Sequence, residues 1–406
     1  MSRRPLEGLR ILSAEQMISL PHATQLLSLL GAEVLKVEPL GGESGRHGRP
    51  QVEEEDGTQT GSTFVRNNLG KSTVSLDLKS ETGRALFLDL AGQVDAVCEN
   101  FRPGAVDKLG IGYAAVRERN PSVLYVSISG FGNRTDPPSP YRERSAYAPV
   151  VEAMAGLYEY AREGDTMPRL ASAGALGDTG PALYAVIGLL SALHERERTG
   201  QGTHVDVAMY DAMIALADVV HLASVGVEPS RATRGIGILD SFRADDGWFT
   251  IEVVREPHFP RFCDAVEQPD WKQDPRLATR AGWAEHLEDV IRPAVEAWAR
   301  GRSKHEAAAA LAAHGVAAGP VNAASDIVSD PHVQARGLVH RFDQAGGGPP
   351  VDVIGSPLDF LGEEAEDAAR PRRWPGLGAQ SERVLSEWLG LSSERIAELK
   401  REGVVG

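Results

Sequence analysis

The first 130 residues alternate short apolar runs with helical patterns, and this alternation constrains the fold more than any other feature of the sequence. The predicted strands are residues 8–12, 32–38, 73–78, 94–99 and 123–129, and the predicted helices are residues 21–30 and 81–90. Gly31 ends the first helix, as glycine commonly does. Strands that alternate with helices at this spacing predict a mostly parallel sheet covered on both faces, so the expected fold class is α/β.

The loop after the first predicted strand reads LSAEQMISLP (residues 12–21) and contains no GxGxxG. A standard dinucleotide cradle is therefore not expected. Ligands of open parallel sheets still gather beyond the carboxyl ends of the strands. The segments expected there are residues 13–21, 39–49, 100–104 and 130–147.

The composition and pattern change near residue 225, and 406 residues are too many for one ordinary core. We expect a large domain at 1–224, a small domain at 225–330 and a C-terminal segment at 331–406. The further predicted strands are residues 203–209, 248–254 and 315–322, and the further helices are 211–224, 285–299, 304–314, 382–389 and 393–401.

The net charge of −15 argues against nucleic acid or a membrane surface as a partner, because polyanions would be repelled. Any anionic ligand must therefore find a local basic pocket. Cys98 and Cys263 belong to no metal-binding pattern, and the eleven histidines form no HExxH, so no metal site is predicted. Such cysteine usage is typical of a reduced, cytoplasmic protein.

The N-terminal residues MSRRPLEGLRILSAEQ contain no uninterrupted apolar stretch, so no signal peptide is expected. Residues 170–193 are long enough to raise a transmembrane alternative. They include Asp178 and Pro181, however, and a buried turn followed by a helix is the favoured interpretation.

Asp178 is the only charged residue in 170–193, and it lies where a glycine-rich turn precedes a helical pattern at 182–195. A carboxylate at this position either caps the helix or reacts. We expect it to be ionised, because the positive end of a helix stabilises an anion. Gly174 and Gly177 would let a large ligand approach the backbone closely. An ionised carboxylate beside a bound thioester can attack the carbonyl carbon, expel a thiolate and form a mixed anhydride without a metal or a histidine base.

A second group of candidates follows the predicted strand at 94–99. Asn100, Phe101 and Arg102 begin the loop NFRPG, and Lys108 lies about one helical turn further on. Together they could stack an adenine on the phenyl ring and pair phosphates with the two cations. In the alternative interpretation the ring packs into the core and the cations are solvated.

Four more charged residues are ambiguous. Lys71 and Arg46 are more typical of surface cations than of ligand contacts, and Glu15 and Glu38 are expected in turns. No GxSxG is present, so an esterase triad is not indicated.

Four segments resemble the class III coenzyme A transferases, a family of formyl-CoA transferases and carnitine CoA-transferases that also contains the α-methylacyl-CoA racemases. They read PLEGLRILSAEQMISLPHATQLLSLLGAEVLKVEPLGGESGR, NNLGKSTVSLDLKSETGRALFLDL, ENFRPGAVDKLGIGYAAVRERNPSVLYVSISGFG and GDTGPALYAVIGLLSALHERERTGQGTHVDVAMYDA. The resemblance extends over nearly the whole chain. It implies a Rossmann-like, CoA-binding large domain built from both ends of the chain, a smaller α+β domain and an interlocked homodimer.

By position, Asp178 matches the catalytic aspartate of the family, which forms an acyl anhydride and then an aspartyl-CoA thioester. The positions that match the CoA site are Ile18, Ser19, Lys71, Asn100, Phe101, Arg102, Lys108 and Tyr147, the last near the thioester. The resemblance implies no prosthetic group. Coenzyme A and acyl-CoA are expected as substrates, with a carboxylic acid as acceptor.

The chain departs from the family pattern at two places. Ile18 stands where formyl-CoA transferases have glutamine, and Ala148 where they have glutamate, so oxalate is not expected as a substrate. Residues 146–148 read AYA where the racemases have Gly-His-Asp. Without the histidine base, efficient epimerisation at an α-carbon is not expected.

The expected function is therefore that of an acyl-CoA:carboxylate CoA-transferase. The alternatives are an α-methylacyl-CoA racemase or epimerase, a non-catalytic CoA-binding protein and a thioester hydrolase. The acceptor acid stays open among dicarboxylates, bile-type acids and aromatic acids. Residues 234–242 of the small domain are expected to shape its pocket.

Overall fold

A computed structural model of the chain describes residues 4–54, 56–160, 166–170, 174–217, 219–226, 237–344, 347–360 and 371–406. These residues form two compact units. The larger unit contains the described parts of 1–158, 170–218 and 332–406, and the smaller unit those of 159–169 and 219–331. Residues 234–236 of the expected acceptor segment lie outside the described residues.

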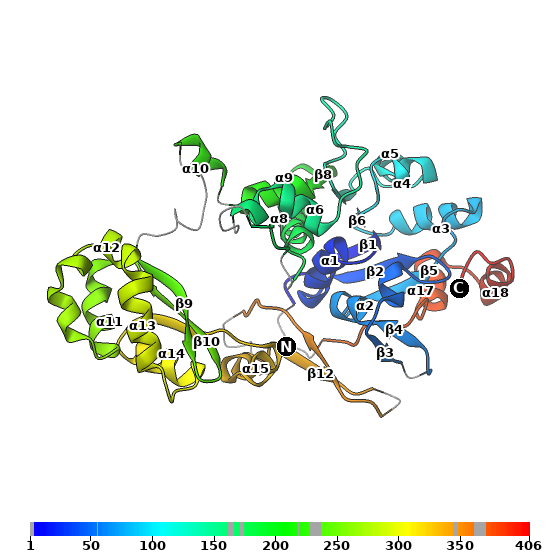
Figure 1. Ribbon diagram of the computed structural model, residues 1–406. Helices are drawn as coiled ribbons and strands as arrows, with labels where there is room; N and C mark the ends of the chain where they lie inside the picture. Colours follow the sequence, from blue (N-terminus) through cyan, green and yellow to red (C-terminus); the bar gives the residue numbers. More distant parts are fainter. Residues whose placement is uncertain are drawn as a thin grey trace. The chain divides into compact units, whose positions relative to one another are not determined.

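The larger unit is built on a six-stranded parallel sheet, which confirms the α/β class (Figure 1). In spatial order its strands are β5 (Ser72–Ser75), β2 (Glu33–Glu38), β1 (Arg10–Ala14), β6 (Ala96–Glu99), β7 (Leu124–Ser129) and β8 (Thr203–Ala208). The chain winds outward from β1 in one direction and from β6 in the other. The carboxyl ends of these two strands therefore flank the crevice where sheets of this kind bind ligands.

Helices and two short hairpins surround this sheet. The helices and turns are α1 (Ser19–Leu29), η1 (Ser44–His47), α2 (Ser62–Asn67), α3 (Glu81–Ala91), α4 (Ala105–Leu109), α5 (Tyr113–Arg119), α6 (Ala148–Met154), α7 (Leu157–Tyr160), α8 (Leu176–Thr199), α9 (Met209–Leu216), α16 (Pro331–Ala335), α17 (Ser381–Leu389) and α18 (Ser393–Arg401). The hairpins pair β3 (Gln51–Glu53) with β4 (Gln59–Gly61), and β12 (Val339–Phe342) with β13 (Val351–Ile354).

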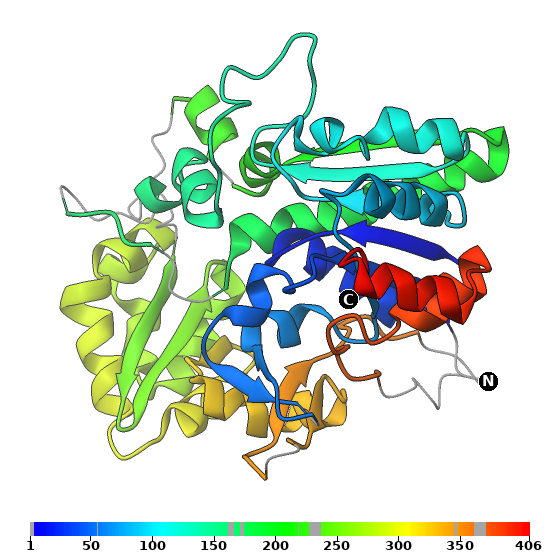
Figure 2. The same ribbon diagram turned by 90° about the vertical axis from the view of Figure 1, so that its right-hand side faces the viewer.

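Both faces of the sheet are covered, so successive side chains of a strand enter different apolar clusters. Leu12 and Leu35 face the cluster that contains α3, α17 and α18, whereas Ile11 and Val34 face the cluster of α1 and α8. Figure 2 shows the two C-terminal helices, in red, beside the sheet. This two-sided burial explains why the strands read as continuous apolar runs in the sequence.

Helix α8 is, of the described helices, the one long and apolar enough to cross a membrane. It packs on α1, β7 and β8, and its small apolar residues belong to a buried cluster of the larger unit. Packing within the protein explains the apolar residues on its buried face, whereas Leu183 and Ile187 are exposed.

The smaller unit has a three-stranded antiparallel sheet in the order β11 (Ala317–Pro320), β10 (Gly247–Val253), β9 (Ile238–Ala244). Its helices and turns are α10 (Val220–Ser224), η3 (Glu256–His258), α11 (Phe259–Ala265), η4 (Pro269–Gln273), η5 (Pro275–Leu277), α12 (Arg280–Glu285), the π-helical turn η6 (Leu287–Ile291), α13 (Arg292–Trp298), α14 (Lys304–Ala313) and α15 (Ala324–Ser329). Aromatic side chains fill its core, where the rings of Phe259 and Trp283 stack with centroids 4.3 Å apart.

The two cysteines are both buried, Cys263 in the core of the smaller unit and Cys98 in β6 of the larger one. Both thiols are free.

Some predicted boundaries were wrong. The first strand begins at Arg10 rather than at residue 8, because Gly8 has a φ of +88° and ends a turn. The predicted helix at 285–299 is interrupted by the turn η6, and Pro293 lies in the first turn of the helix that follows. The strand β9 and the hairpins β3–β4 and β12–β13 were not predicted.

Candidate active site

Asp178 lies in the first turn of α8, two residues after the helix begins at Leu176. The predicted start at residue 182 was therefore too late. The N-cap residue is Ala175, and no side chain caps the helix from that position. Instead, the carboxylate of Glu152 in α6 accepts a hydrogen bond of 2.7 Å from the backbone N–H of Gly177. Glu152 thus performs the capping that was considered for Asp178.

Gly177 is required by close packing between α6 and α8. A Cβ atom at this residue would lie 2.7 Å from both the Cα and the carbonyl oxygen of Ala148. The expectation that a ligand approaches the backbone of Gly177 was therefore wrong, because α6 already occupies that space. Gly174, with a φ of +73°, does face open space. Tyr147 immediately precedes Ala148 and is 68% exposed, so this contact brings Tyr147 near the turn that carries Asp178.

The Asp178 carboxyl is half-buried, and burial raises its pKa to about 6. The negative charge of Glu152 adds to this rise, and the positive charge of Arg66 in α2 opposes it. The direction of this shift is opposite to the one expected from the positive end of the helix, but a pKa near 6 still leaves most of the group ionised at neutral pH. Such a carboxylate can act as a nucleophile.

Three other candidates meet where the carboxyl ends of β1 and β6 flank the crevice. The Asn100 side chain accepts a hydrogen bond of 3.0 Å from the N–H of Gln16 and donates one of 3.0 Å to its carbonyl oxygen. It also donates to the Ser19 hydroxyl at 3.3 Å. Ile18 lies between, as the N-cap residue of α1. The Asn100 side chain thus fixes the turn between β1 and α1 by hydrogen bonds to the main chain of Gln16.

The remaining residues of the NFRPG loop differ in exposure. Phe101 is half-buried and packs against the apolar cluster of α3, which favours the alternative interpretation for its ring. Arg102 is exposed and donates a hydrogen bond of 2.8 Å to the Ser145 hydroxyl, which links the loop to the segment before Tyr147. Lys108 is exposed on α4.

Lys71 is not a surface cation. Its side chain is fully buried, and Nζ donates to Glu15 at 2.7 Å, to the Asn68 side-chain oxygen at 2.9 Å and to the Pro21 carbonyl oxygen at 2.9 Å. Burial lowers the pKa of this amine to about 8, and Glu15 opposes the shift. All three N–H donors of the amino group are used inside the protein. The amino group therefore stabilises the turn between β1 and α1.

Glu15 lies in the turn after β1, as expected, but it is buried, whereas Glu38 is buried within β2 rather than in a turn. Glu15 also accepts hydrogen bonds from the Thr24 hydroxyl. Glu38 is the last residue of β2, and its carboxylate receives two hydrogen bonds of 2.7 Å from Arg46, which is buried as well. These pairs were missed because the turns after parallel strands are commonly solvated, and nothing local marks them as buried.

Sequence reasoning also missed Glu152 and Arg66, which act on Asp178. Glu152 is 3% exposed and accepts a hydrogen bond from the Tyr158 hydroxyl. Its sequence neighbourhood resembles an amphipathic helix with one polar residue, which gave no signal of a role.

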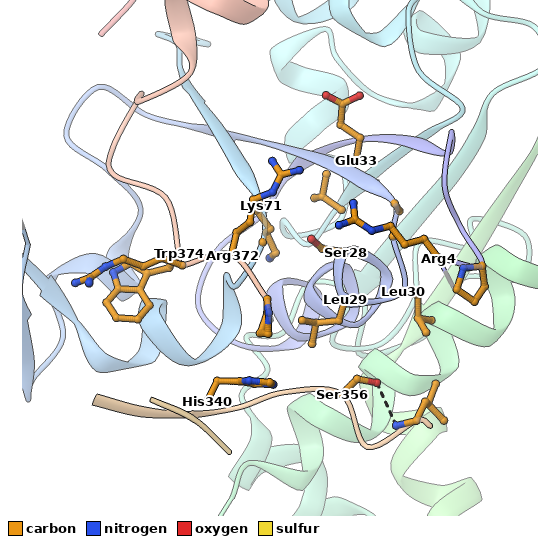
Figure 3. Close-up of a pocket in the computed structure, with 18 of the residues that line it drawn as sticks. Arg4, Ser28, Leu29, Leu30, Glu33, Lys71, His340, Ser356, Arg372 and Trp374 are labelled. Atoms are coloured by element: carbon orange, nitrogen blue, oxygen red, sulfur yellow. Dashed lines mark hydrogen bonds between the residues drawn. The ribbon is translucent and has the colours of Figure 1, made fainter. Parts of the chain in front are cut away.

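A large cavity in the described part of the chain lies elsewhere. It has a volume of about 1310 Å³ and opens at the amino ends of β1, β2 and β5. Figure 3 shows Arg4, His340 and Arg372 around it. Asp178 and Asn100 do not line this cavity. Asn100 follows the carboxyl end of β6, at the opposite edge of the sheet, and Asp178 lies in α8. The candidate site is thus defined by its side chains and by the topology of the sheet.

The sequence and the fold of the chain are both similar to those of known proteins. The family profile described as "CoA-transferase family III" matches residues 6–381. A succinyl-CoA:mesaconate CoA-transferase of Haloarcula hispanica is 34% identical over 359 residues, which are 87% of this chain and 89% of that protein. A formyl-CoA:oxalate CoA-transferase of Streptomyces coelicolor is 30% identical over 431 residues and the full length of both chains, 100% of each. The crystal structure of a CAIB/BAIF family protein from Brucella suis has a TM-score of 0.83 and 30% identity, and the match covers 95% of this chain and 100% of that one.

Proposed function

The chain belongs to CoA-transferase family III and is a CoA-transferase, and we propose that it moves coenzyme A between carboxylic acids through covalent intermediates on Asp178. The observation that carries this proposal is the environment of the Asp178 carboxylate. It is half-buried in the first turn of α8, and it forms no side-chain hydrogen bond or ion pair with the rest of the described chain. A carboxylate that is partly desolvated in this way is more reactive than one in water.

The proposed reaction runs in four displacements. Asp178 attacks the thioester carbonyl carbon of the donor, the C–S bond breaks and the CoA thiolate leaves, which produces a mixed anhydride. The thiolate then attacks the aspartyl carbonyl carbon and releases the donor acid, so that an aspartyl-CoA thioester forms. The acceptor carboxylate attacks this thioester and expels the thiolate again. Finally the thiolate attacks the acceptor's acyl carbon and frees the Asp178 carboxylate.

We propose that coenzyme A binds in the crevice at the carboxyl ends of β1 and β6. Ile18 and Ser19 border it, and Asn100 fixes the turn that carries them. The exposed cations Arg102 and Lys108 would pair with the phosphates of coenzyme A, and Tyr147 would lie near the thioester group of the bound acyl-CoA. Phe101 and Lys71 support these residues from within the protein. The local cations offset the net charge of −15, which would otherwise repel a polyanionic substrate.

We propose dicarboxylic acids as the substrate class. The names of the two relatives pair coenzyme A with mesaconate and with oxalate, which are both dicarboxylic acids. Arg66 is exposed and acts electrostatically on Asp178, so it is suited to bind the second carboxylate of such a substrate. Succinyl-CoA is the donor that we propose to test first.

The proposal is tested by exchange of labelled succinate into succinyl-CoA, which needs no knowledge of the physiological acceptor. Asp178→Asn should lower the exchange rate by at least about 1000-fold, because the nucleophile is removed. The matched control is Asp211→Asn, which changes an aspartate in the first turn of the neighbouring helix α9 and should retain exchange. Circular dichroism verifies that both variants fold.

Hydroxylamine added during exchange should convert Asp178 to its hydroxamate, which mass spectrometry of the peptide detects. Exchange that persists in Asp178→Asn would contradict the proposal. Deuterium uptake at the α-carbon without added acid would identify a racemase, and free CoA released without exchange would identify a hydrolase. Stabilisation by CoA without any turnover would identify a binding protein.

We also propose that the protein is a cytoplasmic homodimer. Leu183 and Ile187 lie one turn apart on α8 and are 50% and 58% exposed, which leaves an apolar stripe for a second copy to cover.

A further inference from the structure

We propose that Glu152 positions Asp178 for attack and that its negative charge sets the pH range over which Asp178 reacts. This inference rests on the proposed function of Asp178. Glu152 would not touch the substrate, so it is a positioning residue rather than a catalytic one.

Both oxygens of Glu152 are engaged at the start of α8. One accepts the N–H of Gly177 at 2.7 Å, and the other accepts the hydroxyl of Tyr158. The N–H of Gly177 belongs to the first turn of α8, where backbone donors have no partner within the helix. Gly177 directly precedes Asp178 in the chain. The hydrogen bond therefore fixes the main chain next to the reacting carboxylate.

The packing around this hydrogen bond leaves little freedom. Glu152 is 3% exposed, and the contact of Gly177 with Ala148 brings the backbones of α6 and α8 together. A buried carboxylate that is held in this way keeps a fixed distance from the first turn of α8. Its charge is poorly screened by water, so it acts strongly on a nearby group.

The elements that pack on α8 are α1, α6, α9, β7 and β8, and α2 packs on α1. Their titratable and charged side chains in this part of the unit are His22, Arg66, Tyr125, Glu152, His204, Asp206, Tyr210 and Asp211. Two of them act on Asp178: Glu152 raises the pKa of its carboxyl, after the effect of burial, and Arg66 lowers it. Glu152 is therefore the charge whose removal should shift the titration of Asp178 downward.

The charge has a chemical consequence. A carboxylate with a higher pKa is a stronger nucleophile, while a pKa near 6 still leaves it ionised at neutral pH. Without the charge of Glu152, Asp178 would stay ionised at lower pH but would attack more slowly.

Glu152→Gln removes the negative charge of this side chain but nearly preserves its shape. Glutamine has the same size, its oxygen can accept the Gly177 N–H, and its amide can donate to the Tyr158 hydroxyl. The matched control is Glu195→Gln, which removes the same charge from the exposed far end of α8, 17 residues after Asp178 and roughly 25 Å away.

The experiment measures exchange of labelled succinate into succinyl-CoA between pH 4.5 and 8.5. In Glu152→Gln we expect the acid limb of the rate profile to move down by about one pH unit and the plateau to fall by roughly 3–10-fold. Glu195→Gln should leave both unchanged. Glu152→Asp retains the charge but shortens the side chain, so it should keep the acid limb of the wild type and lower the plateau.

An unchanged acid limb in Glu152→Gln, or an equal shift in Glu195→Gln, would overturn the inference. If Glu152→Gln does not fold, an acid limb that moves in Glu152→Asp overturns it as well. Hydroxylamine trapping in the same samples separates this result from a failure of the proposed function. When Asp178 is labelled but the limb does not move, only the role of Glu152 is wrong; when Asp178 is never labelled, the nucleophile itself is wrong.

Discussion

The Asp178 carboxyl destabilises the folded protein at neutral pH. Its pKa is about 6 in the folded state and about 3.8 in the absence of these surroundings. Between these two values the folded state binds more protons than the unfolded state, so the free energy of unfolding falls as pH rises through this window. Above about pH 6 the ionised carboxylate lowers the free energy of unfolding by its full amount.

Asp178→Asn should therefore make the protein more stable while it abolishes exchange. We expect the free energy of unfolding at pH 7.5 to rise by about 1–2 kcal/mol, a value reduced for the partial exposure of the group. The gain should shrink as the pH is lowered to about 4.5, where the wild-type carboxyl is mostly protonated. Urea unfolding at both pH values measures it. A variant no more stable than the wild type at pH 7.5 would contradict this expectation.

Single residues show where sequence reasoning succeeds and where it fails. Asp178 could be singled out because a lone charge in an apolar run is a local signal. The pair of Lys71 and Glu15 could not, because the two residues are 56 positions apart and each looks like a surface residue until the other is known. Burial of a charge depends on its partner, and the partner is set by tertiary structure.

At the scale of elements, the contact of α6 with α8 places the site. Gly177 and Gly188 are both on α8 and both closely approached, but by different neighbours. A Cβ at Gly177 would meet the backbone of Ala148, whereas one at Gly188 would meet the Val205 side chain in β8 at 2.6 Å. The first contact aligns the turn of Asp178, and the second packs the helix on the sheet.

Gly177→Ala and Gly188→Ala should thus separate alignment from stability. Both should lower the free energy of unfolding by about 1–3 kcal/mol, because each overpacks a close contact. Only Gly177→Ala should also lower the exchange rate per folded molecule, because α6 must move away from the first turn of α8. Exchange assays corrected for the folded fraction measure the difference. Equal activity in the two variants would mean that the α6–α8 contact does not align Asp178.

The elements themselves were largely predictable where the pattern is long and regular. Alternating apolar runs indicated the parallel strands, and Gly31 marked the end of α1. The start of α8 was placed too late because Pro181 looks like a first-turn residue, whereas the helix already includes the five residues before it. The cap of that helix comes from Glu152, which lies in another element and leaves no sequence signal at residue 176.

At the scale of the whole molecule, the chain returns to its first unit after forming the second. Val384, Leu399 and Val405 complete the apolar cluster on one face of the sheet, and Leu76 pairs with Val405 across most of the sequence. The order of the strands and this return could not be derived from periodicity, which indicates elements but not their neighbours.

The proposed homodimer is tested at this scale. Light scattering should give twice the 43.5 kDa of one chain. Ile187→Glu places a charge on the exposed apolar stripe of α8 and should shift the mass toward that of one chain. His194→Glu, at an exposed polar position of the same helix, should leave the mass unchanged. A wild-type protein with the mass of one chain would contradict the proposal.

The two thiols of the chain are both enclosed, Cys98 in the sheet and Cys263 in the core of the smaller unit. Burial raises the pKa of each, so the thiolate that reacts with maleimides is scarce. The native cysteines therefore need not be removed before a fluorophore is attached elsewhere. One engineered surface cysteine in each unit would then give a pair of labelling positions for dyes.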